Sequence, residues 1–176
     1  MKSTGVVRRV DDLGRVVIPK EIRRTLKIRE GGELEIFVDN DEVIFKKFSK
    51  IVDLSEIAKK LIDVVSSVVG KTILVTDRDK IVVGSGDLRK KYLNKSISKK
   101  IGDVIVERNV CVEKNVVSLD IVDDICEQCS YVICPIISFG DVIGSIILFS
   151  LNNDVSEFDI IISKMIAQFL GKYVEE

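Results

Sequence analysis

Apolar residues recur with helical spacing in the middle and at the end of this 176-residue chain. One apolar stripe runs from Leu54 to Val68 before Gly70, and a broader one runs from Phe158 to Tyr173. Both stripes predict amphipathic helices. The first should begin at the capping-box pattern Asp53-Leu-Ser-Glu56, and the second should span residues 154 to about 174.

Shorter apolar runs between these helices predict strands. The expected strands are 71–76, 80–83, 116–122, 131–137 and 142–149. The last two should form a hairpin that turns at Phe139-Gly140-Asp141, and residues 88–107 should form helical pieces with a solvated lysine face. Helices that bracket several strands predict an α+β domain over residues 53–176.

The first 50 residues follow a different pattern, with short β-type runs around a proline. Pro19 disfavours helical backbone at Ile18 and suits the first turn of a helix, so a short helix should run from Pro19 to about Lys27. The expected strands are 5–10, 16–18, 33–38 and 42–47. The last two are apolar on both faces, so we expect a second chain to cover them, and residues 1–50 to form a separate, dimeric domain. The connection at 48–52 contains no glycine or proline and should be stiff.

Charge is distributed unevenly along the chain. The segment Lys2–Arg29 holds nine basic and three acidic residues, or +6, whereas residues 51–176 hold 15 basic and 19 acidic residues, or −4. On the predicted helix, Lys20, Arg23, Arg24 and Lys27 share one face that contains no acid, unlike most solvated faces. This asymmetry predicts a polyanionic partner for the basic end.

The sequences STGVVRRVDDLGRVVIPKEIRRTLKI and GELEIFVDNDEVIFKK resemble the DNA-binding domain of the AbrB family of prokaryotic transition-state regulators. The resemblance implies a swapped-hairpin β-barrel in which two chains interleave to bind double-stranded DNA, with loose sequence preference. It places the DNA-contacting arginines at Arg8, Arg15, Arg23 and Arg24, with Arg9 and Lys20 as additions.

In the second domain, TILVTDRDKIVVGSG and YVICPIISFGDVIGSIILFS resemble a GAF domain, a fold that senses small molecules on a central antiparallel sheet. An AbrB-type module followed by a GAF-like domain is similar to a family of sporulation regulators of endospore-forming bacteria. That resemblance implies a transcriptional regulator of late forespore development that activates or represses according to the promoter. We also expect the apolar helix stripes to pair two dimers into a tetramer. The ligand is not evident from the sequence.

Composition weighs against catalysis, because histidine, the commonest general base and metal-ligating side chain, is absent. We expect no cofactor, no metal site and, in the absence of a signal peptide or an 18-residue apolar run, a cytoplasmic protein. Four cysteines leave three alternatives open, which are ordinary thiols, a redox pair at the CxxC motif, and metal ligation: Cys111, Cys126, Cys129 and Cys134. Two other functions stay open, a cysteine-dependent reductase of methionine sulfoxide on the GAF fold and an AbrB-like antitoxin.

Overall fold

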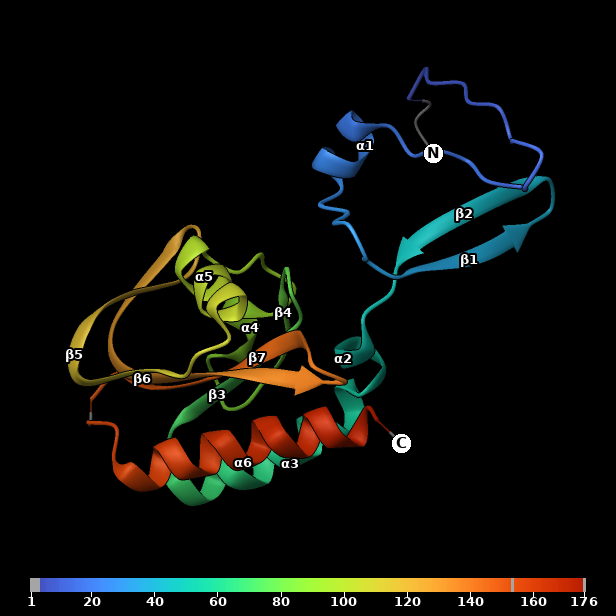
Figure 1. Ribbon diagram of the computed structural model, residues 1–176. Helices are drawn as coiled ribbons and strands as arrows, with labels where there is room; N and C mark the ends of the chain where they lie inside the picture. The colour runs from blue at the N-terminus through green and yellow to red at the C-terminus, as the bar shows by residue number, and fades with distance from the viewer. Residues whose placement is uncertain (1–3, 153, 176) are drawn as a thin grey trace. The chain divides into compact units, whose positions relative to one another are not determined.

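The computed structural model describes residues 4–152 and 154–175. The chain forms two compact units, Met1–Phe48 and Ser49–Glu176 (Figure 1). Lys2, the first cation of the basic segment, lies outside the described residues. Among the described residues, no helix combines the length and apolarity that crossing a membrane requires.

The N-terminal unit contains a short helix and a hairpin. Helix α1 covers Lys20–Thr25, and strands β1 (Leu34–Asp39) and β2 (Glu42–Lys47) pair antiparallel. Asn40 has a positive φ of 50° at the hairpin turn, a conformation that asparagine adopts more readily than most residues. The predicted hairpin is confirmed, and the predicted helix is confirmed with an earlier end at Thr25.

The strands predicted at 5–10 and 16–18 are not formed in the isolated chain. These segments flank a turn in which the Asp11 N–H donates to the Arg15 carbonyl at 3.1 Å and the Gly14 N–H donates to the Asp11 carbonyl at 3.0 Å. A strand needs a neighbouring strand to complete its hydrogen-bond ladder, and the described sheet of this unit contains only β1 and β2. The prediction was therefore wrong for one chain, because strand propensity alone supplies no pairing partner.

The C-terminal unit is built on an antiparallel sheet with the strand order β4-β3-β7-β6-β5. Its strands are β3 (Thr72–Thr76), β4 (Ile81–Gly84), β5 (Cys111–Val122), β6 (Ile125–Ser138) and β7 (Asp141–Ser150). All predicted strands of this domain are present. However, β5 and β6 begin well before the predicted strands. They pair with each other along a long hairpin that the sequence pattern did not indicate.

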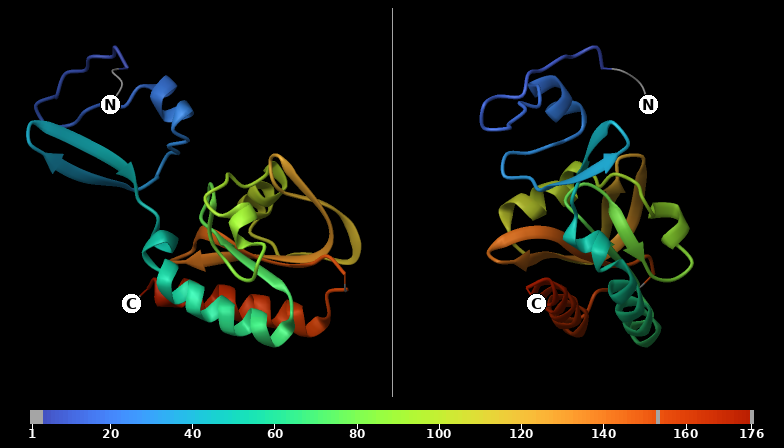
Figure 2. Two further views of the ribbon diagram at one scale, coloured as in Figure 1. Left: turned by 180° about the vertical axis from the view of Figure 1, so that it is seen from behind. Right: turned by 90° about the vertical axis from the view of Figure 1, so that its right-hand side faces the viewer.

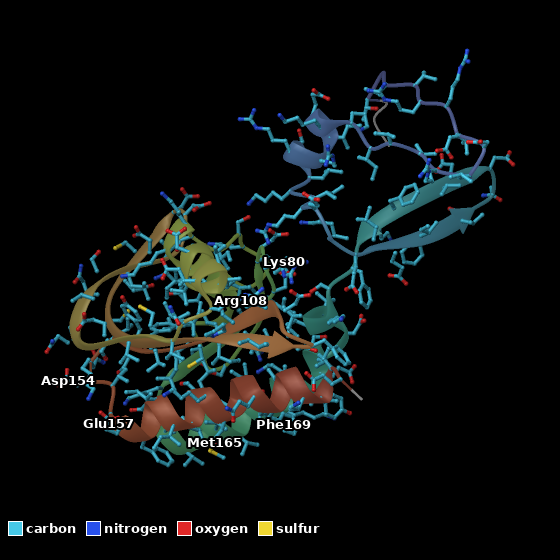
Figure 3. The ribbon with its side chains drawn as sticks, viewed as in Figure 1. Lys80, Arg108, Asp154, Glu157, Met165 and Phe169 are labelled. Carbon is cyan, nitrogen blue, oxygen red and sulfur yellow. The ribbon has the colours of Figure 1, made fainter. Side chains whose placement is uncertain are left out.

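Helices cover both faces of this sheet, as Figures 1 and 2 show. The helices are α2 (Lys50–Asp53), α3 (Ser55–Val69), α4 (Arg89–Tyr92), α5 (Lys99–Glu107) and α6 (Glu157–Tyr173). Because successive strand residues point to opposite faces, Ile73 packs in the core with α3 and α6, whereas Leu74 packs in the core with α4 and α5. Side chains fill both layers (Figure 3). The predicted α+β domain is confirmed.

The capping box predicted at Asp53 is not formed. Asp53 is the last residue of α2, Leu54 is the N-cap of α3, and no side chain caps that helix. The Leu54 N–H donates to the Lys50 carbonyl at 3.3 Å, so the backbone before α3 is already helical. A capping residue needs a non-helical backbone, which explains why the motif failed here. The connection at 48–52, which was predicted to be stiff, includes the first three residues of α2.

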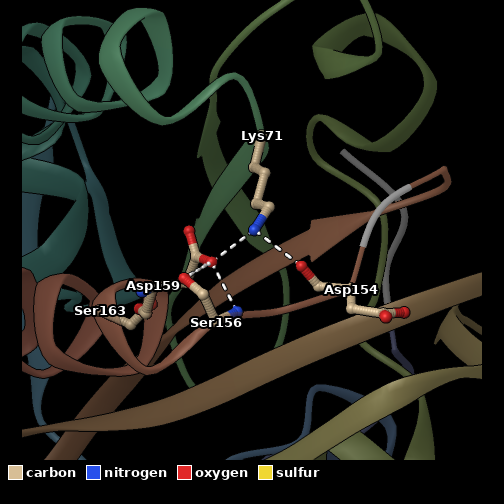
Figure 4. A network of polar contacts seen from close by, with 5 residues as sticks. All are labelled: Lys71, Asp154, Ser156, Asp159 and Ser163. Carbon is tan, nitrogen blue, oxygen red and sulfur yellow. Dashed lines mark hydrogen bonds and ion pairs between the residues drawn. The ribbon is translucent and has the colours of Figure 1, made fainter.

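A capping box forms instead at the start of α6 (Figure 4). Ser156 Oγ accepts from the Asp159 N–H at 3.3 Å, and Asp159 Oδ2 accepts from the Ser156 N–H at 2.8 Å. Lys71 immediately precedes β3, and its Nζ forms an ion pair with the same carboxylate and donates to the Asp154 carbonyl at 3.0 Å. Ser163 Oγ donates to the Asp159 carbonyl at 2.7 Å. The cap therefore also attaches α6 to the sheet.

Candidate nucleic-acid interface

The N-terminal unit exposes the six basic side chains that are expected to contact DNA. These residues are Arg8, Arg9, Arg15, Lys20, Arg23 and Arg24. Within the part of the chain that the structure describes, Arg15 pairs with Asp11 and the other five form no ion pair. Positive charges without acidic partners create a surface potential that attracts polyanions.

Helix α1 presents three of these cations. Pro19 is the N-cap, with φ −56°, and its ring is buried. Ile22 is half-buried, whereas Lys20, Arg23 and Arg24 are exposed on the remaining surface of the helix. Arg23 and Arg24 lie in the last turn, where the helix dipole favours positive charge. The basic side of the helix is exposed as expected, but its apolar side is not buried in one copy of the chain, because Leu26 is 52% exposed.

Arg15 is held by a turn that closes around Asp11. The Leu13 and Arg15 N–H groups donate to Asp11 Oδ1 at 3.0 and 2.7 Å, and Arg15 Nε donates to Asp11 Oδ2 at 2.8 Å. Gly14 has a φ of 75°, a left-handed conformation that favours glycine. The hydrogen bonds from the Arg15 N–H and side chain lower the pKa of Asp11. This role of Asp11 was not predicted from the sequence, although an aspartate followed by a glycine at this spacing is a turn signal.

The basic residues therefore fall into three groups. Arg8 and Arg9 lie on the irregular segment before the turn, Arg15 closes the turn, and the α1 cations follow Pro19. The structure records no bond between these groups among the described residues. Each group is presented to solvent by its own local element, which suits contacts spread along an extended ligand.

The four cysteines do not form a common site. Cys126 and Cys129 both lie on β6, three positions apart, so their side chains point to opposite faces of the strand. Cys126 is exposed and its Sγ lies 2.7 Å from Ser118 Oγ, whereas Cys129 and Cys134 are buried. All four cysteines are free, and the described residues contain no cluster of three potential metal ligands. A CxxC motif in a strand, unlike one in a turn, separates its two thiols.

Polar groups in the layer between the sheet and helices α4 and α5 are paired with one another. The Glu127 carboxylate accepts hydrogen bonds from Lys91 Nζ and from the Tyr92 hydroxyl. Burial opposes ionisation of Glu127, but these two donors outweigh it and lower its pKa. Lys100 lies over the ring of Tyr131, 4.8 Å from the centroid. These contacts stabilise the layer and indicate no particular ligand.

Both parts of the chain are similar to known proteins. Residues 53–175 match the family described as stage V sporulation protein T C-terminal, transcription factor. Residues 7–47 match the family described as antidote-toxin recognition MazE, bacterial antitoxin. Transition state regulatory protein AbrB of Bacillus subtilis is 65% identical over 48 residues, which span 27% of this chain and 50% of that relative. The solved N-terminal DNA recognition domain of that regulator is 63% identical and covers 28% of this chain and 92% of its own, with a TM-score of 0.25.

The C-terminal unit has the GAF fold. The cofactor-binding GAF domain of the nutrient sensor CodY from Clostridium difficile covers 66% of this chain and 83% of its own, with 15% identity and a TM-score of 0.50. Stage V sporulation protein T of Bacillus subtilis is 46% identical over 178 residues, which span 100% of both chains. The chain therefore belongs to the stage V sporulation protein T family of transcription factors, with an AbrB-like N-terminal domain and a GAF-like C-terminal domain.

Proposed function

We propose that this protein is a DNA-binding transcriptional regulator of late, forespore-stage sporulation genes, activating some promoters and repressing others. Residues 1–50 bind double-stranded DNA at the nucleoid, in the cytoplasm, and residues 53–176 regulate that binding through assembly or through a small-molecule ligand. The observation that carries the proposal is the exposed basic surface of the N-terminal unit in a member of a transcription factor family.

The basic surface is proposed to contact DNA chiefly through phosphates. Arginine donates two parallel hydrogen bonds to paired oxygen acceptors, and no exposed aromatic side chain lies among the six basic residues to stack on bases. If one dimer neutralises roughly 8 phosphates, the logarithm of the association constant should fall with the logarithm of salt concentration at a slope of about −7.

Two matched double variants test this assignment by fluorescence anisotropy on a labelled duplex. Replacing Arg15 and Arg23 together by alanine should weaken DNA binding, because both substitutions remove contacts to phosphate. It should also make the dependence of the association constant on salt concentration shallower. Replacing Arg89 and Lys90 by alanine removes the same charge from exposed positions of the C-terminal unit and should change affinity little. Unchanged affinity of the first variant would reject the proposed interface.

The N-terminal domain is proposed to be an intertwined dimer, because one copy has no core of its own. Among its described residues, Pro19 alone is buried, whereas Val7 is 89% and Val38 76% exposed. Burial of one such side chain contributes about 1.5–3 kcal/mol, so a second copy that covers several of them supplies the missing stability. Residues 1–50 alone should sediment as a dimer, and a stably folded monomer at micromolar concentration would contradict the proposal.

The full-length protein is proposed to be a tetramer that forms through α3 and α6. Met165 and Phe169 lie on α6 (Figure 3), and they are 57% and 46% exposed. Phe158 and Ile161 on the same helix are also exposed. These residues form an apolar stripe at i, i+3, i+7 and i+11, which suits packing against another helix.

The mass of the protein in solution tests the tetramer. Met165→Asp should convert it to a dimer, because a charge in an apolar helix contact has no partner there. Val106→Asp is the matched control, since Val106 is an exposed apolar residue on α5 and the substitution introduces the same charge outside the stripe. A wild-type protein that stays dimeric at tens of micromolar would reject the tetramer.

Two alternative functions receive less support from the geometry. A reductase would use the cysteines, but the thiols of the CxxC motif lie on opposite faces of β6. An antitoxin of the MazE type would use a disordered toxin-binding tail, whereas residues 49–176 form a folded unit. We therefore propose a regulator without catalytic activity. Consumption of free methionine sulfoxide by the purified protein would reject this part of the proposal.

A further inference from the structure

Asp11 is an acidic residue within a strongly basic segment, and its two carboxylate oxygens accept hydrogen bonds from different groups. Oδ1 accepts from the N–H groups of Leu13 and Arg15, which closes the turn. Oδ2 accepts from Nε of the Arg15 side chain at 2.8 Å. One oxygen therefore shapes the backbone, and the other orients a guanidinium group that belongs to the proposed DNA surface.

We propose that Asp11 is a positioning residue for nucleic-acid recognition, which holds the Arg15 guanidinium so that its two terminal nitrogens face the DNA. This inference rests on the proposed function. A bond to Nε leaves both Nη groups without a partner among the described residues, and these are the two groups that form a bidentate contact. The acceptors are paired oxygens of a phosphate or the O6 and N7 atoms of guanine.

The pairing matters for binding because an unrestrained arginine loses much rotamer freedom when it contacts DNA. Arg15 has 70% of its side chain exposed, so packing against the protein does not fix its direction. The hydrogen bond from Nε to Asp11 and the backbone bonds of the turn fix it instead. The same hydrogen bonds lower the pKa of Asp11, so the carboxylate is ionised and available as an acceptor at neutral pH.

Electrostatics alone predicts the opposite role for Asp11. A carboxylate near phosphates repels them, so its removal should strengthen DNA binding. The neighbouring Asp12 is also exposed and makes no hydrogen bond or ion pair among the described residues. Asp12 therefore provides a control in which the charge is removed without loss of a contact to Arg15.

The test compares Asp11→Asn with Asp12→Asn in the full-length protein. Asparagine at position 11 keeps an Oδ1 that accepts from Leu13 and Arg15, but it replaces Oδ2 by an NH₂ group, which cannot accept from Nε. We expect Asp12→Asn to bind a duplex as tightly as wild type or more tightly. Asp11→Asn should bind roughly fivefold or more weakly than Asp12→Asn, the lower end of what one well-placed arginine fork contributes. Equal affinities of the two variants would overturn the proposal.

The same two substitutions in an Arg15→Ala background separate positioning from a general effect on the fold. If Asp11 acts through Arg15, Asp11→Asn and Asp12→Asn should have equal affinities once the arginine is absent. If Asp11→Asn still binds more weakly in that background, Asp11 acts through the turn as a whole and the proposal is wrong. If Arg15→Ala alone leaves DNA binding intact, the proposed interface fails, which is a different result from failure of the Asp11 assignment.

Two duplexes distinguish the acceptors. One is selected by the wild-type protein from a random pool, and the other is a shuffled sequence of the same composition. If Arg15 reads guanine, Asp11→Asn should lower affinity for the selected duplex more than for the shuffled one. If Arg15 binds phosphate, both affinities should fall by the same factor. No fall on either duplex would overturn the proposal.

Discussion

The ion pair between Lys71 and Asp159 predicts a large loss of stability when one partner is removed. The side chains are only 10% and 3% exposed, and the Asp159 carboxylate also accepts from the backbone N–H of Ser156 at 2.8 Å and from its hydroxyl at 2.5 Å. Asp159→Asn removes the negative charge that compensates the poorly hydrated Lys71 ammonium, which is left with neutral acceptors such as the Asp154 carbonyl at 3.0 Å. An uncompensated buried charge of this kind costs about 3–5 kcal/mol.

We expect Asp159→Asn to lower the free energy of unfolding by about 2–4 kcal/mol, because the asparagine oxygen can still cap α6 and Lys71 keeps the Asp154 carbonyl. Adding Lys71→Met should recover part of this loss, since the double variant buries no unpaired charge. The cost of the double variant should therefore be less than the sum of the two single costs.

The loss should also depend on pH. Burial opposes ionisation of Asp159, but hydrogen bonds from Lys71 and Ser156 outweigh it, so the pKa lies below its ordinary value of 3.8. A carboxylate with a lowered native pKa stabilises the fold above its unfolded pKa, and this contribution is lost as the pH falls through the native pKa. The difference between wild type and Asp159→Asn should therefore be complete at pH 7 and should narrow below about pH 4.

Urea unfolding followed by tyrosine fluorescence measures this difference in the correct domain, because the three tyrosines, Tyr92, Tyr131 and Tyr173, all lie in the C-terminal unit. Glu157→Gln is the matched control. Glu157 lies in the same helical turn, but its ion pair with Lys114 is exposed, so its loss should have no measurable effect. If Asp159→Asn unfolds at the same urea concentration as wild type at pH 7, the Lys71 contact does not stabilise the fold and the reasoning is refuted.

Further predictions concern thiols and helix packing. Burial raises the pKa of Cys129 to about 11 and that of Cys134 to about 12. At pH 8 a thiol reagent should therefore label the exposed Cys126 quickly, and Cys129 and Cys134 only after unfolding. Fast labelling of all cysteines in the native protein would contradict this burial. A Cβ on Gly171 would lie 2.1 Å from the Ile137 carbonyl oxygen, so Gly171→Ala should destabilise the packing of α6 on the sheet, as a thermal melt would show. Gly102→Ala, in open space within α5, should be neutral or stabilising, and a similar loss from both variants would argue against the close approach.

Local chemistry in the sequence was sufficient for several features. Pro19 restricts its own φ and its neighbour, so the start of α1 could be predicted within the chain itself. The apolar period of residues 158–173 predicted α6, and the turn at Phe139-Gly140 predicted the hairpin of β6 and β7. The exposure of the basic residues also followed, because arginine and lysine are almost never fully buried unless they are paired.

Other features were decided by tertiary structure. The capping box lies at Ser156 and not at Asp53, because α2 already gives Asp53 a helical backbone. The CxxC motif indicated a possible thiol pair, but pairing of β5 with β6 placed it in a strand, where Cys126 and Cys129 face opposite sides. The Lys71–Asp159 pair joins residues 88 positions apart, and no sequence window contains both. Propensities and caps act over a few residues, whereas strand partners and buried ion pairs depend on distant segments that only the folded chain brings together.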